Sequence, residues 1–213
     1  MRGSSHRWMF GALAAVGLMG VASLTACPDP KGRLDDWFGR SEPLRKIPSA
    51  GECVGISDIS GSYLLGVAVS IDKSKPLRFK LDVTVNVDAG TIDATMQPIA
   101  APPNNGATEP GTLVGEKFTA SSPIDPAAGT FSLDFGGVDV PLEANPIIAV
   151  PAAADIALVG CTATPESSCG LVDGKLTKPI DQSIEGSTWA IVPLPDGTNP
   201  ISIELVTACP DPT

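Results

Sequence analysis

Histidine is nearly absent from this chain of 213 residues, because His6 is the only one. Serine and cysteine hydrolases use a histidine as their general base, and zinc sites often use histidine ligands. The chain after residue 6 therefore cannot build either kind of centre in its ordinary form. The sequence also has no GxSxG, GxGxxG or GxxxxGK[ST] motif, the signatures of a nucleophile elbow, a dinucleotide fold and a phosphate loop. We expect no enzyme activity.

Aromatic and basic side chains are also scarce. One tyrosine, three tryptophans and six phenylalanines are few for a lectin, which stacks sugars on exposed rings. Lysine and arginine total 14 against 24 acidic residues, a net charge of −10. Nucleic acid is bound by clustered lysine and arginine, so we expect no nucleic-acid partner.

The first 26 residues have the order of an export signal. A short basic start with Arg2 and Arg7 precedes an uncharged and mostly apolar stretch over residues 8–26. This layout predicts a secretory signal peptide with a helical apolar part. Because the stretch is nearly long enough to cross a bilayer, an uncleaved membrane helix is the alternative.

Leu24-Thr25-Ala26-Cys27 ends that stretch and resembles the lipobox of bacterial lipoproteins, in which an apolar and two small residues precede a cysteine. In that family the chain is cut before the cysteine, whose thiol is diacylated. The resemblance implies a lipoprotein signal peptide over residues 1–26 and lipidation of Cys27. Two or more acyl chains hold a protein stably on a membrane. We therefore expect a lipid-anchored protein of the cell envelope, in the outer membrane on its periplasmic or surface face.

Residues 27–50 follow as a predicted tether. They contain four prolines and both signs of charge, which favours a loosely ordered, flexible spacer. The alternative is that Leu34, Trp37 and Phe38 form one amphipathic turn that docks onto the domain or the membrane surface. Removal of residues 1–26 would leave 12 basic and 24 acidic residues, and the whole of the acidic excess falls after residue 50. Residues 51–213 are enough to bury one sizeable core. The sequence thus predicts a single domain over 51–213.

Four cysteines follow Cys27, namely Cys53, Cys161, Cys169 and Cys209. An even number in an exported chain indicates disulfides, and the absence of a CxxC spacing disfavours a metal site. Three pairings are possible, and we favour Cys161–Cys169 with Cys53–Cys209. The seven residues between Cys161 and Cys169 are turn-like, and a hairpin there would bring the two sulfur atoms within bonding distance.

Apolar and polar residues alternate along much of the predicted domain, the pattern of strands with one buried face. In residues 77–87, six apolar residues alternate with five polar ones. With residues 61–71 and 91–96 they predict an antiparallel meander. Further strands are expected over residues 112–120, 130–135, 138–142, 155–161, 170–177, 187–192 and 201–207.

The abundance of turn-forming residues indicates an all-β fold. The 22 glycines and 21 prolines favour a turn-rich domain without helices. About ten antiparallel strands at regular spacing predict a barrel, with a β-sandwich as the alternative.

Gly136-Gly137 is expected to form the two-residue turn of a hairpin. In that register Asp134 would stand opposite Asp139, and two opposed carboxylates repel each other. A bound Ca²⁺ could offset the repulsion, because hard cations take carboxylate oxygens. Screening by solvent on an edge hairpin is the other explanation. We therefore name Asp134 and Asp139 as a candidate site for Ca²⁺ and expect no cofactor.

These features predict a membrane-anchored envelope lipoprotein whose β domain is non-catalytic and binds a small ligand or an envelope protein. The alternative is a structural or surface-display protein without a small ligand. A hollow barrel would favour a ligand, whereas a filled barrel with an exposed apolar patch would favour a protein partner. A glycosidase-like enzyme is the least favoured hypothesis, and it would need two acidic side chains about 5–9 Å apart in a cleft.

Overall fold

The computed structural model describes residues 53, 55–102, 108–148, 150–162 and 168–209, all within one compact unit, Lys46–Thr213. The predicted signal peptide, the lipobox-like motif with Cys27 and the predicted tether lie outside the described residues. Within the described residues, no helix has the length and apolar character needed to span a bilayer.

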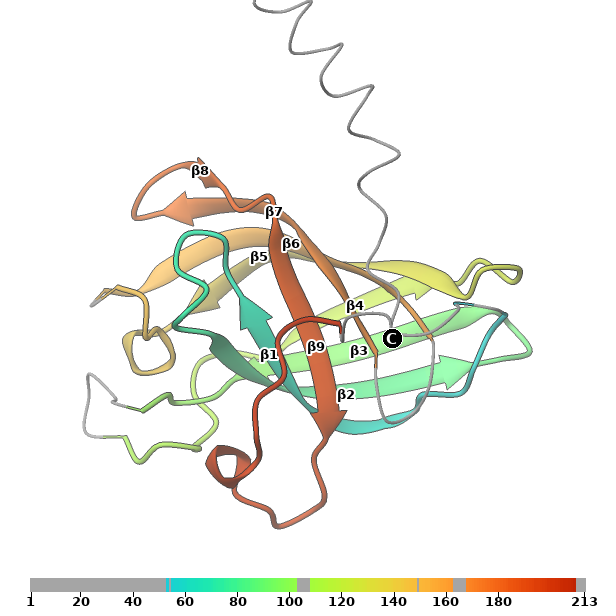
Figure 1. The fold of residues 1–213 in the computed structure, drawn as a ribbon, viewed down its shortest axis with the longest axis horizontal. Helices are drawn as coiled ribbons and strands as arrows, with labels where there is room; N and C mark the ends of the chain where they lie inside the picture. The colour runs from blue at the N-terminus through green and yellow to red at the C-terminus, as the bar shows by residue number, and fades with distance from the viewer. Residues whose placement is uncertain (1–52, 54, 103–107, 149, 163–167, 210–213) are drawn as a thin grey trace, which may run out of the picture. The chain divides into compact units, whose positions relative to one another are not determined.

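The unit is a single antiparallel sheet that curves into a nearly closed barrel (Figure 1). The order across the sheet is β4-β3-β2-β1-β9-β7-β6-β5, and β8 pairs with β7. The predicted all-β barrel is confirmed, and the sandwich alternative is wrong. The strands are β1 (Gly61–Ala68), β2 (Leu77–Asn86), β3 (Thr91–Pro98), β4 (Phe118–Pro123), β5 (Thr130–Val140), β6 (Ala152–Cys161), β7 (Cys169–Lys178), β8 (Gln182–Ser183) and β9 (Ser187–Pro193), with 3-10 turns η2 (Leu142–Ala144) and η3 (Pro200–Ser202).

The predicted meander of β1, β2 and β3 is confirmed. Leu81 of β2 stands opposite Tyr63 of β1 on one side and Met96 of β3 on the other. All three side chains are buried. The residues on either side of Leu81, Lys80 and Asp82, face outward, and their charged groups form an ion pair at 2.9 Å. The alternation in the sequence therefore separates the barrel interior from solvent.

β5 is one strand rather than a hairpin, so the predicted turn at Gly136-Gly137 is wrong. It pairs with β6 from end to end, with a bulge between Asp134 and Gly136. Gly136 has a φ of +62°, which glycine adopts at little cost. A bulge of this kind bends a strand without ending it. A two-residue hairpin turn needs the same left-handed backbone as this bulge. Gly136-Gly137 is therefore compatible with a hairpin turn and with a bulge.

The extended segment over residues 203–209 is not a strand, and the prediction of a strand over 201–207 is wrong. Its alternation still has a structural meaning, because Leu205 packs against the cluster that contains Leu64, on the outer face of β1. Gly66 of β1 makes room, since a Cβ there would overlap the backbone of this segment. β1 already pairs with β2 and β9, so the segment covers its face.

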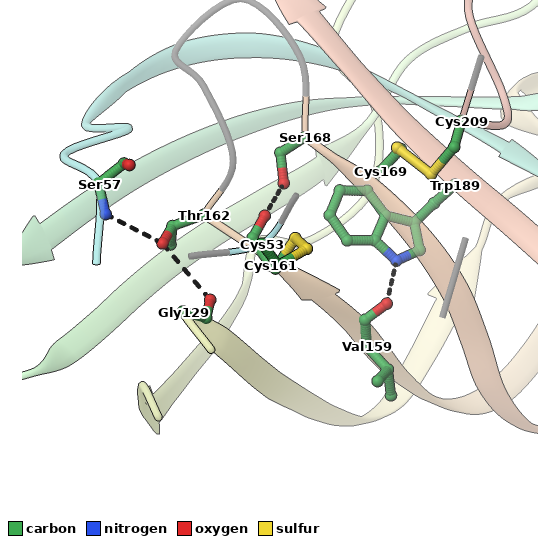
Figure 2. The surroundings of a disulfide bond; sticks show 10 residues. All are labelled: Cys53, Ser57, Gly129, Val159, Cys161, Thr162, Ser168, Cys169, Trp189 and Cys209. Atoms are coloured by element: carbon green, nitrogen blue, oxygen red, sulfur yellow. Dashed lines mark hydrogen bonds between the residues drawn. A yellow bond between two sulfur atoms is a disulfide. The ribbon is translucent and has the colours of Figure 1, made fainter. Parts of the chain in front are cut away.

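The four cysteines after Cys27 form two disulfides, but the pairing is not the one predicted. Cys53 is bonded to Cys161, and Cys169 is bonded to Cys209 (Figure 2). The favoured Cys161–Cys169 and Cys53–Cys209 bonds are therefore wrong. The pairing between β6 and β7 stops before either cysteine, and beyond that point Cys161 pairs with β5 and Cys169 with β9. Cys161 is therefore bonded to the segment that precedes β1, and Cys169 to the segment that follows β9.

A tight turn over residues 125–129 joins β4 to β5, the two strands at the ends of the sheet. The Asp125 carboxylate accepts hydrogen bonds from the backbone N–H groups of Ala127 and Ala128, at 2.8 and 2.9 Å. These bonds lower the pKa of Asp125, and the bond from Ala128 has the larger effect. The ionised carboxylate therefore stabilises the turn.

We expect Asp125→Ala to destabilise the domain at pH 7 and to have less effect in acid. A carboxyl group whose pKa is lowered by folding contributes stability above its unfolded pKa, and that stability is lost as the pH falls through the folded value. The difference in urea midpoint between wild type and Asp125→Ala should therefore shrink below about pH 4. Asp125→Asn keeps an acceptor oxygen that does not ionise and should remove this pH dependence. A wild-type-to-alanine difference that stays constant down to pH 3 would contradict the role of the carboxylate.

Candidate functional site

The two halves of the barrel interior differ. We call the end at which β1, β5 and β7 finish the open end, and the opposite end the far end. Away from the open end the interior is filled by Phe131, Leu158 and Trp189, each at most 5% exposed. The rings of Phe131 and Trp189 lie 6.2 Å apart. The void left there is about 10 Å³, room for one water at most.

Trp189 stands at the boundary of this filled half. Its Nε1 donates a hydrogen bond to the carbonyl oxygen of Val159 at 3.1 Å (Figure 2), so the buried polar atom is satisfied. The ring fits because residue 160 is glycine, and a Cβ at Gly160 would overlap it. Val67, the residue opposite Trp189 on β1, lines the hollow half.

The open half holds a cavity of about 320 Å³, within the range of small-molecule sites. Its wall comes from β1, β2, β5, β6 and β7 and from the connections at the open end. Every lining side chain except Asn145 is apolar. The barrel is therefore hollow in this half, the feature expected of a barrel that binds a small ligand. The wall includes Val67, Phe79, Val138, Ala154, Ile156 and Val172.

The cavity exists because the side chains at the start of β6 are small. Ala152 and Ala154 pack toward the interior core and line the cavity. Farther along the same strand the inward side chains are Ile156 and Leu158, which are much larger. The barrel is consequently hollow where β6 begins and filled where β6 ends. The run of alanines at residues 152–154 is the sequence feature that underlies this cavity, although the run alone does not show that Ala152 and Ala154 face the interior.

Asn145 does not make the cavity polar. Its side chain is 3% exposed, and its Oδ1 accepts hydrogen bonds from the backbone N–H groups of Ile147 and Ile148, at 3.1 and 3.3 Å. Its Nδ2 donates to the carbonyl oxygen of Val150 at 2.9 Å. In the part of the chain that the structure describes, no buried side-chain polar atom lacks a partner. A polar ligand group buried without a partner would be costly, so the cavity suits hydrocarbon.

The cavity reaches the surface at the open end. Ile71, after β1, and Ile180, after β7, line it although they are 40% and 53% exposed. Figure 1 shows the β1–β2 connection, the β5–β6 connection and β8 gathered at this end of the barrel. A ligand would enter between these connections.

Asp134 and Asp139 do not form the predicted opposed pair. On the continuous strand β5 they stand opposite Ala157 and Ala153 of β6, roughly 15 Å apart along the strand. Asp134 accepts a hydrogen bond from the backbone N–H of Gly136 at 2.8 Å. The geometry that suggested a Ca²⁺ site is therefore wrong. Among the described residues, no three histidine, cysteine, aspartate or glutamate side chains are grouped to hold a metal.

Comparisons with known proteins give no family assignment. No protein-family model matches the chain, and a comparison with curated proteins found no significant match. Function is therefore inferred from the sequence and from the cavity.

Proposed function

We propose that this chain is a lipid-anchored, non-catalytic protein of the cell envelope whose barrel binds a small apolar molecule. The cavity of about 320 Å³ with its almost wholly apolar wall carries the binding part of the proposal. The lipobox ending at Cys27 supports the anchor, through acyl chains on that residue, and we place the anchored protein in the outer membrane.

The hollow interior favours a ligand over a purely structural barrel. Atoms that line an empty cavity lack packing partners on one side, and this lowers the stability of the fold. A ligand that fills the space restores those contacts and gains about 25 cal/mol per Å² of apolar surface buried. Because Asn145 is occupied within its own loop, the buried part of the ligand is expected to be hydrocarbon, such as an acyl chain.

Ala154→Phe tests the proposal, because it places a ring in the cavity. Ala157→Phe on the same strand is the matched control: the flanking residues Ile156 and Leu158 belong to the interior core, so residue 157 points outward. Native mass spectrometry of the full chain should show one bound molecule in wild type and in Ala157→Phe. Ala154→Phe should lower its occupancy by about tenfold or more without lowering the thermal stability, since the ring enters existing space.

Two results would refute the ligand proposal. One is a wild-type chain that carries no molecule when isolated and binds none of a series of fatty acids and fatty alcohols. The other is equal occupancy in wild type and Ala154→Phe, which would place the bound molecule outside the cavity.

A further inference from the structure

Exposed aliphatic side chains gather around the mouth of the cavity. We call residues 70–76, 141–148, 150–151 and 178–181 the rim; they are segments of three of the connections at the open end, next to the cavity-lining residues Ile71, Ile147 and Ile180. The rim contains Ile71, Val150 and Ile180, which are 40%, 43% and 53% exposed. They are three of the six exposed large aliphatic residues in the described part of the chain. Ile71 and Ile180 also line the cavity, so the apolar surface continues from the interior to the outside.

The charge of the rim differs from that of the rest of the domain. Its charged residues are three acidic and three basic, whereas residues 51–213 as a whole contain 20 acidic and 7 basic residues. With the other connections at the open end, residues 99–117 and 182–186, this end has six acidic and four basic residues. An anionic lipid surface repels the acidic body, and it repels this end less than the domain as a whole. Lysine side chains also place their ammonium groups at headgroup level while their stems cover apolar surface. The charged residues of the rim are Asp72, Lys73, Lys75, Glu143, Lys178 and Asp181, of which Asp72 and Lys75 form an ion pair at 3.5 Å.

We infer that the rim docks onto a lipid bilayer, with Ile71, Val150 and Ile180 entering its interfacial layer. The cavity then opens into lipid rather than into water. If the cavity binds an acyl chain, as the proposed function requires, that ligand passes between the bilayer and the barrel without crossing solvent.

The chain before the barrel is long enough for this orientation. Cys53 is bonded to Cys161 at the far end, opposite the rim. The stretch from Cys27 to Cys53 can extend to about 90 Å at most, whereas a ten-residue strand is about 33 Å long. An anchor on Cys27 therefore allows the open end to face the same membrane.

Fluorescence quenching by labelled lipid tests the docking in the full, lipidated chain. An environment-sensitive fluorophore is attached at Ile180→Cys, and the chain is reconstituted into phosphatidylethanolamine–phosphatidylglycerol vesicles with brominated acyl chains. Val87→Cys is the matched control, because Val87 is 45% exposed but lies in the β2–β3 turn at the far end. The bromines should remove most of the fluorescence at residue 180 and little at residue 87.

Equal quenching at both positions, or none at either, would overturn the docking. So would a spectral shift at residue 180 that depends on the surface density of protein and not on brominated lipid, since the rim would then contact a second copy. The same measurement in the Ala154→Phe background separates the two proposals. Quenching at residue 180 should persist there even though the cavity is filled, so docking and ligand binding can fail independently.

Discussion

Trp189→Ala should lower the free energy of unfolding by about 3–5 kcal/mol, as expected for a large buried aromatic residue. Trp189 is 2% exposed, packs against Phe131 and donates a hydrogen bond to the carbonyl oxygen of Val159. The alanine variant loses all three contributions. Gly160 cannot fill the vacated space, because it has no side chain. Urea unfolding followed by circular dichroism measures the loss.

Trp189→Phe is the control for the ring. It keeps most of the apolar contact but leaves the Val159 carbonyl without this donor, so its loss should be smaller than that of alanine. A Trp189→Ala variant destabilised by less than about 1 kcal/mol would contradict a core role for the indole. The substitution also removes the boundary beside Val67 and should extend the cavity, so longer hydrocarbon chains should bind better to Trp189→Ala than to wild type.

Removing the Cys53–Cys161 disulfide should lower the free energy of unfolding by about 4–5 kcal/mol. The bond closes a loop with a sequence separation of 108 residues, and the chain-entropy model gives a cost of this size for opening it. Replacing both Cys53 and Cys161 by serine avoids free thiols. Denaturant unfolding without reductant measures the loss.

The other disulfide provides the comparison. Cys169–Cys209 spans 40 residues, and its double serine variant should lose about 4 kcal/mol, somewhat less than the first. A clearly larger loss for this second pair would contradict the loop-length reasoning. Peptide mapping without reductant gives a separate check, since a Cys161–Cys169 peptide would contradict the pairing itself.

The parts of the fold that depend on neighbours in the chain could be predicted from the sequence. β2 alternates without interruption, and it is close in the chain to its neighbours: eight residues separate it from β1 and four from β3. Pattern and proximity therefore agree. Alternation reports which way side chains face and not what the backbone pairs with. For residues 201–207, the prediction of which side chains face the domain was therefore correct, and the prediction of a strand was wrong.

The rest depended on contacts between distant parts of the chain. Gly136 can adopt the backbone of a turn or of a bulge. It forms a bulge because β5 pairs with β6 along its whole length. The disulfide pairing followed from the contact of β7 with β9, which no local pattern reveals. The cavity depended on Ala152 and Ala154 lying inside the barrel, and the small size of an alanine predicts a hollow only when its surroundings are known. Lipidation of Cys27 stays a prediction.

The bond between Cys53 and Cys161 also decides where mechanical force enters the barrel. Tension on the chain that precedes Cys53 passes through the disulfide to the end of β6, a strand held on both sides by β5 and β7. The force therefore does not pull directly on β1, the first strand of the described residues. A pull on the chain before Cys53 thus enters the barrel at the far end, away from the open end of the cavity.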